Sequence, residues 1–391
     1  MPTQTASPTP RVAITAVFAA FGVIAGIWSG SVPTVARSVG LDGYWLGATF
    51  TGLMLCNVVA MSVGGQLARA VSSRWMLLTV IPVMAGAAIL VHWFSSLWIF
   101  LPALFGFGFA QGLCDLFMNA EGSRIEAELG RPIYSGLHGV CSLSLAIGAI
   151  FGSLIAVGIG PWASAPIFAA AGCIAAWLVW RAIPERPPVK RPGSARPVLA
   201  AVYGPLALLG LAVGFENAGE IAAILWSAKL LNEVAPALAS IAGIGPAFYA
   251  GCNALVRLNG DLVRARYGDK RVVIASLLIA AAGLVGVGVL PGFGERVAAF
   301  AVIGFGTACI IPCLYAIASN TDPERRAARL GFVSMVAGPP RVLSPLAFGW
   351  VAQFSSMSTA FGLSSLLLVL ALGLFLASQA GMARQAAVSA A

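Results

Sequence analysis

A pair of carboxylates stands inside an otherwise apolar stretch of the chain, GFENAGEIAAILWSAKLL, residues 214–231. Glu216 and Glu220 are four residues apart, which places them on one face of a helix about 6 Å from each other. Two carboxylates that close in apolar surroundings favour the protonated form of at least one. The spacing therefore predicts a site that takes up and releases a proton, with Glu220 as the favoured carrier, unless a carboxylate instead pairs with Lys229 or Arg341 to hold the fold.

A second group of titratable side chains lies on other apolar segments. Asp115 and Asn119 are four residues apart and share a helical face, and His138 stands at similar depth on the next segment. Asp115 and His138 are therefore further candidates for proton coupling. The alternative for His138 is a satisfied hydrogen-bonding residue, which a lone histidine in an apolar helix often is.

Arg341 is a cation in the middle of an apolar segment. It stands within GPPRVLSP, where Pro339, Pro340 and Pro345 break the backbone hydrogen bonds and free carbonyl oxygens. Membranes tolerate such a break mainly beside a cavity or a neighbouring helix. A fixed positive charge there predicts binding of an anionic or polyhydroxylated solute, and the alternative is a structural pair with a glutamate.

Other polar or aromatic side chains are candidates for contact with the same solute. Asn57 and Asn253 lie in the middle of separate apolar segments, where an amide either binds a solute or joins two helices. Lys229 lies near one end of its segment and alternatively reaches the membrane interface. Trp226 alternatively is a packing residue or an interfacial anchor.

Composition predicts the elements that carry these residues. Hydrophobic residues make up 59% of the chain and charged residues 9%, which leaves too little polar surface for a soluble protein. Apolar runs of about 20 residues, enough to cross a bilayer, recur along the chain, so we expect an all-α polytopic membrane protein. The twelve expected transmembrane helices are 12–34, 44–66, 76–93, 97–119, 134–157, 164–181, 201–231, 237–256, 272–291, 297–319, 331–353 and 359–379.

Positive charge predicts the orientation of the chain. Lys and Arg concentrate in alternate breaks and in the tails, with Arg37, Arg296, Lys229 and Arg341 as the exceptions. Because cytoplasmic loops carry the excess of Lys and Arg, both termini are expected in the cytoplasm. The net charge of +9 is then explained by insertion, and no nucleic-acid partner is expected.

Residues that would indicate an enzyme or a cofactor are missing from the sequence. The seven cysteines all fall inside expected spans, without the spacing of a metal site or a disulfide framework. There is no P-loop and no nucleophile elbow, and the two histidines lie on different helices. We therefore expect neither an enzyme nor an ATP-driven pump, and no metal or other cofactor.

An internal repeat predicts two halves. The segment GGQLARAVSSRW from residue 64 recurs in outline as NGDLVRARYGDKR from residue 259, and Cys56-Asn57 recurs as Cys252-Asn253. Parallel six-helix halves of this kind hold a solute site between them near the middle of the membrane. The expected organisation is a disordered cytoplasmic tail (1–11), an N-terminal half (12–183), a cytoplasmic linker rich in Pro and Arg (184–198), a C-terminal half (199–380) and a cytoplasmic tail (381–391).

With these features, nearly the whole chain resembles the major facilitator superfamily. The segments DLFMNAEGSRIE, GRPIYSGLHGVCSLS, EIAAILWS and RLNGDLVRARYG are similar to a bacterial branch related to the fucose:proton symporter. The resemblance implies two pseudo-symmetric halves that expose a central site alternately to either side. It also implies a multi-pass protein of the bacterial inner membrane.

The resemblance also implies gating residues, with departures from the family pattern. The family's loop motif between helices two and three usually carries an Asp where this chain has Arg69. Its counterpart between helices eight and nine keeps Gly260, Asp261 and Arg264. An Asp-based cytoplasmic latch is therefore expected in the second half.

The fourth and fifth helices bear on the direction of transport. Drug exporters of the family carry a Gly-Pro motif in the fifth helix, which this chain lacks, and an Arg-x-x-Gln-Gly motif in the fourth, which appears here without its Arg, as Gly108-Phe-Ala-Gln111-Gly112. Uptake is favoured over efflux on these grounds. Gln111 and Asn119 join the solute-binding candidates on the fourth helix.

The function expected from the sequence is secondary active transport by a monomer in the lipid bilayer. The favoured form is proton-coupled uptake of a small polar or anionic organic solute, sugar-like or an organic acid. The alternatives are a proton-driven exporter of drugs or natural products and a non-transporting membrane receptor.

Overall fold

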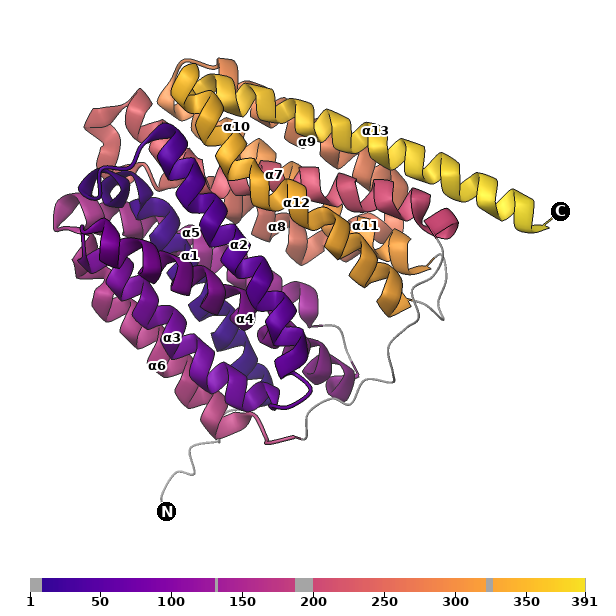
Figure 1. Ribbon diagram of the computed structural model, residues 1–391, viewed down its shortest axis with the longest axis horizontal. Helices are drawn as coiled ribbons and strands as arrows, with labels where there is room; N and C mark the ends of the chain where they lie inside the picture. The colour runs from indigo at the N-terminus through magenta and orange to yellow at the C-terminus, as the bar shows by residue number, and fades with distance from the viewer. Residues whose placement is uncertain (1–8, 131–132, 187–199, 321–325, 391) are drawn as a thin grey trace.

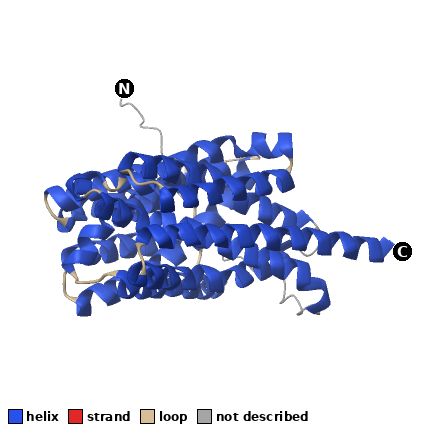
Figure 2. Ribbon diagram, turned by 90° about the horizontal axis from the view of Figure 1, so that it is seen from above, coloured by secondary structure: helices blue, strands red, loops and turns tan. Residues whose placement is uncertain are grey.

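The computed structural model describes residues 9–130, 133–186, 200–320 and 326–390. Helices and short turns make up this part of the chain (Figures 1 and 2), so the predicted all-α class is confirmed. The elements are α1 (Pro10–Ser38), α2 (Gly43–Leu67), α3 (Ser73–Trp93), α4 (Leu97–Leu129), α5 (Tyr134–Gly158), η1 (Pro161–Ser164), α6 (Ala165–Ala182), α7 (Ala200–Val234), η2 (Pro236–Ile241), α8 (Ile244–Tyr267), α9 (Asp269–Val289), α10 (Phe293–Thr307), α11 (Ile310–Asn320), α12 (Arg326–Phe354) and α13 (Met357–Ala390).

The helices follow the predicted spans, with differences in length and continuity. Eleven stretches of the described chain are long and apolar enough to cross a membrane, and α12, which carries Arg341, is the remaining long helix. The predicted tenth span, 297–319, is broken at Ala308 and Cys309 into α10 and α11. α13 continues to Ala390, so the region expected as a C-terminal tail is largely helical.

The chain gathers into two groups of helices (Figure 1). Helices α1 to α6 lie on one side and α7 to α13 on the other. Most of the predicted linker (184–198) and of the predicted N-terminal tail lies outside the described residues. The prolines of α12 do not end the helix, because it continues through Pro339, Pro340 and Pro345.

Small residues allow helices within one half to pack backbone to backbone. Gly22, Gly26 and Gly30 form a stripe on α1, and a Cβ atom at each would overlap backbone or side-chain atoms of α5. In lipid there is no hydrophobic drive between helices, so close backbone contact of this kind supplies the packing energy. The stripe fixes α5, and with it His138, against α1.

The two halves touch closely at the end that carries Asp42. There α2 crosses α12 at Gly47 and Gly349, where an added Cβ would overlap the facing backbone. The Ser29 hydroxyl on α1 donates to the Ile224 carbonyl of α7. At the opposite end, where Figure 1 shows the halves diverging, the Cβ sides of Gly331 on α12 and Gly65 on α2 meet open space. We call the Asp42 end the closed end and the end with the basic loops the open end; α5 and α8 still touch toward the open end, where the Ser135 hydroxyl donates to the Arg257 carbonyl at 2.6 Å.

Candidate functional site

A cluster of ionisable groups in the C-terminal half surrounds Glu220. The Tyr249 hydroxyl on α8 donates to Glu220 Oε1 at 2.7 Å, and Arg257 Nη2 lies 3.8 Å from the same oxygen. Arg257 Nε also donates to the Ala308 carbonyl at 3.4 Å, at the break between α10 and α11. The Glu220 carboxylate therefore links α7 to α8 and, through Arg257, to the broken tenth span.

Glu216 stands one turn before Glu220 on α7 and, unlike it, has no hydrogen-bond or ion-pair partner among the described residues. Its side chain has 0% exposed surface, and neither carboxylate oxygen has a hydrogen-bond partner among the described residues. Its electrostatic neighbours are Glu220 and Arg257. A buried carboxylate without a partner is costly when ionised and much less so when neutral. Protonation of Glu216 is the arrangement that fits this site.

Arg257 is a site residue that the sequence analysis missed. The expected eighth span ends at residue 256, which would place Arg257 in a basic loop. In the structure α8 continues to Tyr267, so Arg257 is half-buried inside the helix. Its spacing could have indicated this position, because Arg257 follows Asn253 by four residues and therefore shares its helical face.

A second polar group lies where the halves meet. Arg341 Nη2 on α12 donates to Asn57 Oδ1 on α2 at 3.2 Å, and Arg341 also interacts electrostatically with Asp115 on α4. The structural pair predicted as an alternative, between Arg341 and Glu216 or Glu220, is not among the ion pairs of the described residues; Arg341 instead faces the N-terminal half.

The Asp115 carboxylate belongs to a hydrogen-bonded chain on α4 and α5. Asn119 Nδ2 donates to Asp115 Oδ1 at 2.8 Å, and the Tyr134 hydroxyl donates to Asn119 Oδ1 at 2.8 Å. The His138 ring packs edge-on against Tyr134, with centroids 4.8 Å apart, and against Phe18. His138 is also within electrostatic range of Arg257, so the two polar groups approach each other along α5.

The two repeat-related asparagines are both buried but bind different partners. Asn253 Nδ2 donates to Thr307 Oγ1 on α10 at 3.2 Å, within the C-terminal half, whereas Asn57 accepts from Arg341 across the halves. Gln111 is half-buried on α4. The glycines that flank it, Gly108 and Gly112, press against the α2 backbone, which is helix packing.

Lys229 and Trp226 lie away from the carboxylate cluster, at the closed end. Lys229 Nζ is 2.8 Å from Asp42 Oδ1, in the loop before α2, and 3.0 Å from Glu233 Oε1. Burial alone would raise the pKa of Asp42, but the hydrogen bond and charge of Lys229, with the Gly43 amide, hold it below its ordinary value. This ion pair joins the two halves.

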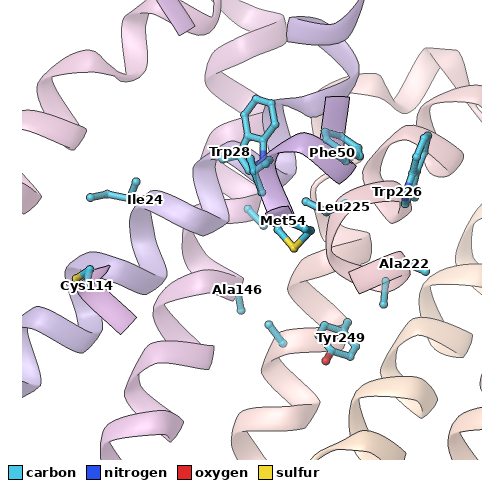
Figure 3. Close-up of a cluster of buried hydrophobic side chains, with 14 of the residues drawn as sticks. Ile24, Trp28, Phe50, Met54, Cys114, Ala146, Ala222, Leu225, Trp226 and Tyr249 are labelled. Carbon is cyan, nitrogen blue, oxygen red and sulfur yellow. The ribbon is translucent and has the colours of Figure 1, made fainter. Parts of the chain in front are cut away.

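Trp226 forms part of an aromatic cluster below that ion pair. Its ring, 0% exposed, stacks on Phe348 with centroids 4.8 Å apart and meets Phe50 of α2 edge-on at 5.2 Å. Phe50 in turn contacts Trp28, 6.1 Å away. Figure 3 shows Phe50 between the two indoles, and Tyr249 on the other side of Ala222. The aromatic cluster and the ion pair together close the Asp42 end.

The predicted gating residues lie at the open end. Arg264 Nε donates to Asp269 Oδ1 at 2.8 Å, across the α8–α9 turn, and Gly260 faces Cys309 Sγ. The side chain of Asp261 lies outside the described part of the structure. Arg69 stands in the turn after α2.

The N-terminal half has its own charge cluster at this end, which the sequence analysis also missed. Glu121 is 1% exposed on α4 and pairs with Arg186 at 2.8 Å and with Arg124 at 3.6 Å. The expected fourth span ends at residue 119, whereas α4 continues to Leu129. The extra turns bury Glu121 where a loop was expected.

No metal site is indicated within the described ranges, since no group of three His, Cys, Asp or Glu side chains is placed to hold an ion. The cysteines in that part of the chain are not joined in disulfides. The groups that the site presents are carboxylates, which can bind protons, and Arg, Asn and Tyr side chains, which can form hydrogen bonds.

Comparison with known proteins gives matches across nearly the whole chain. A family model described as the Major Facilitator Superfamily matches residues 206–390. Similar sequences include an uncharacterized MFS-type transporter of Yersinia pestis, 26% identical and covering 88% of each chain. Another is the membrane protein MosC of Rhizobium meliloti, 24% identical over 95% of this chain and 90% of its own.

Solved structures share the fold at low sequence identity. A mutant form of the nucleoside transporter NupG superposes with a TM-score of 0.78, at 14% identity, covering 95% of this chain and 100% of that one. The human organic anion transporter TETRAN gives 0.63 at 18% identity, with 94% and 100% covered. At such identities the likeness shows the fold and not the solute.

Proposed function

We propose that this chain, a membrane transporter of the major facilitator type and not an enzyme, takes up a small polar or anionic organic solute by proton-coupled alternating access. The observation that carries the proposal is the contrast on α7. Glu216 is buried with no partner, one turn from Glu220, which is hydrogen-bonded to Tyr249 and lies near Arg257.

The contrast supports a division of roles between the two carboxylates. Glu216 fits the site when it carries a proton, and Glu220 fits it when ionised, because Tyr249 and Arg257 then both face a negative charge. Loss of the proton from Glu216 would leave two adjacent carboxylates near one guanidinium. The repulsion would shift the contacts that join α7, α8 and the α10–α11 break.

The solute is proposed to bind between Arg341 and Asp115. These residues come from opposite halves, and Asn57 adds an amide beside the guanidinium. A solute with both acceptors and donors would connect α4 to α12, and so favour closure of the open end. Two structural neighbours are a nucleoside transporter and an organic anion transporter, so nucleosides and organic anions are the kinds of solute to test alongside sugars.

Alternating access then requires the Asp42 end to open. The contacts that would break are the Lys229–Asp42 ion pair and the packing of Phe50 against Trp226. Both join one half to the other near the same end. We propose that solute enters from this side, and that the basic loops, the linker and both termini face the cytoplasm, as the positive-inside rule favours.

Reconstitution into vesicles that contain a pH-sensitive dye tests the proposal. Addition of sugars, nucleosides, organic acids or amino acids in turn should produce proton movement with the transported solute alone. Binding without proton movement would favour a receptor or an uncoupled carrier, and export driven by an opposing pH gradient would favour the exporter. The relation to fucose:proton symporters stays a prediction that the sugar arm of this panel tests.

A further inference from the structure

A cavity of about 600 Å³ lies between the α8–α9 turn, α11 and α13, at the end that carries the basic loops. Lys270 and Arg271 line it, and Ile317 and Met382 give it an apolar wall. Gln379 also lines it, and its Nε2 is buried without a hydrogen-bond partner in the described structure. None of these residues belongs to the carboxylate cluster or to the Arg341 site, so the cavity calls for its own explanation.

Among the described residues, the charges around this cavity do not balance. Asp269 is the acid among its described lining residues, and it already pairs with Arg264 at 2.8 Å. Lys270 and Arg271 are both exposed. The facing wall is formed by α13. This helix adds no negative charge, because Met357–Ala390 contains no Asp or Glu. The cavity therefore carries an excess of positive charge next to apolar side chains.

The start of α3 is the repeat-related position in the N-terminal half, and there the chain itself supplies hydrogen-bond acceptors. Arg74 and Trp75 begin α3 as Lys270 and Arg271 begin α9. Arg74 Nη2 donates to the Trp180 carbonyl at the end of α6 at 2.9 Å, and Trp75 Nε1 donates to Glu185 Oε1 at 3.0 Å. In that half, acceptors at and after the end of α6 satisfy the donors of α3, whereas α13 brings no such carboxylate to α9.

We propose that the headgroup of an anionic phospholipid occupies this cavity. Its phosphate supplies the negative charge and the acceptors that Glu185 and the Trp180 carbonyl supply in the other half, and it accepts from Lys270 and Arg271. Its acyl chains lie against the apolar wall formed by Ile317 and Met382. Basic pockets between helices at the cytoplasmic surface bind such headgroups, and a free phosphate would leave the apolar wall uncovered.

The test uses the full-length protein, purified in detergent and stripped of lipid. Phosphatidylglycerol, phosphatidylcholine and inorganic phosphate serve as the three probes, with bound lipid measured by native mass spectrometry and unfolding by thermal shift. The wild type should retain phosphatidylglycerol over phosphatidylcholine and should melt at a higher temperature in its presence. Because each basic side chain near an anionic lipid changes affinity about 5-fold, Lys270→Gln/Arg271→Gln should bind phosphatidylglycerol roughly 25-fold more weakly.

A matched control removes equal charge from the same end of the molecule. Arg11→Gln/Arg181→Gln alters two exposed cations outside the cavity and should retain phosphatidylglycerol like the wild type. Equal loss in both double variants, or no loss in Lys270→Gln/Arg271→Gln, would overturn the proposal, as would stabilisation by inorganic phosphate alone. Should that variant fail to fold, Lys270→Gln alone removes one cation; about 5-fold weaker retention of phosphatidylglycerol supports the site, and unchanged retention rejects it.

Discussion

Substituting each of the two glutamates of α7 by glutamine should give opposite results, although the change is chemically the same. Glutamine has the shape of a protonated glutamate, and Glu216 has no partner to lose. Glu216→Gln should therefore destabilise the protein less than Glu220→Gln does, because it breaks no hydrogen bond or ion pair. Glu220→Gln removes the charge that Tyr249 and Arg257 face, so it should destabilise the protein.

The size of that loss follows from the geometry. Unit charges about 4 Å apart attract by roughly 4 kcal/mol at an effective dielectric constant of 20, and the Arg257–Glu220 distance is 3.8 Å. Desolvation of both groups cancels much of this, while the Tyr249 hydrogen bond to a charged acceptor adds about 1.5–3 kcal/mol. We expect a net destabilisation of about 2–3 kcal/mol for Glu220→Gln.

Transport measurements should distinguish the proton-carrying role of Glu216 from the structural role of Glu220. With Glu216→Gln, uptake driven by a pH gradient should be abolished, because the site can no longer release its proton. Exchange of labelled for unlabelled solute, which needs no net proton movement, should survive. Glu220→Gln should impair both activities in proportion to the damage to the cluster, although a proton carrier at Glu220, as the sequence favoured, would instead spare exchange.

The assay pairs thermal unfolding in detergent with uptake and exchange in vesicles, for both variants in parallel. Retention of gradient-driven uptake by Glu216→Gln would refute the assignment of the proton to that residue. Equal destabilisation by the two substitutions would refute the reading of Glu216 as unpartnered. Selective loss of gradient-driven uptake in Glu220→Gln alone would return the role to Glu220.

Three further substitutions, and a control for the last of them, test the rest of the site and the packing. Lys229→Gln removes an ion pair between the halves, so spectroscopic labels across the Asp42 end should report that end open about 2- to 5-fold more often, the change that roughly 0.5–1 kcal/mol gives. Because the pKa of Asp42 lies below its ordinary value of 3.8, this ion pair stabilises the closed end above that value. Its contribution is lost as pH falls through the lowered pKa, so wild-type closure should persist at mildly acidic pH. Arg341→Gln should weaken solute binding about 10- to 100-fold, as loss of a charge-assisted hydrogen bond does, while the protein stays folded and monodisperse; loss of folding would indicate a structural role. Gly26→Ala should cost about 1–3 kcal/mol through overlap with the α5 backbone, and Gly65→Ala, which meets open space, should be close to neutral in the same unfolding assay.

Much of the fold was predictable, because the bilayer imposes it locally. A chain without water must satisfy its backbone within each crossing, so apolar length alone predicts most helices. Boundaries were less predictable where a helix continues beyond the apolar run. This is why α4 past residue 119 and α8 past residue 256 were expected as loops, and why Glu121 and Arg257 were missed as buried side chains.

The candidate site was also predictable only in part: pairs within one helix were predicted, and contacts between helices were not. Sequence spacing placed Glu216 with Glu220, and Asp115 with Asn119, because residues four apart share a helical face whatever the tertiary structure. Spacing says nothing about which neighbour a charged group meets. It left Arg341 and Lys229 as alternative partners of the glutamates, whereas the structure brings Arg257 to Glu220, Asn57 to Arg341 and Asp42 to Lys229.

The sequence by itself determined the membrane class, the number of long apolar segments and the residues with a charge that apolar surroundings penalise. Those properties depend on composition and on contacts within one helix. The tertiary structure decided which of two adjacent carboxylates has partners, which cation faces which half, and which end of the molecule is closed. These depend on the rotation of each helix about its own axis and on packing between segments far apart in the chain, which a periodic pattern does not encode.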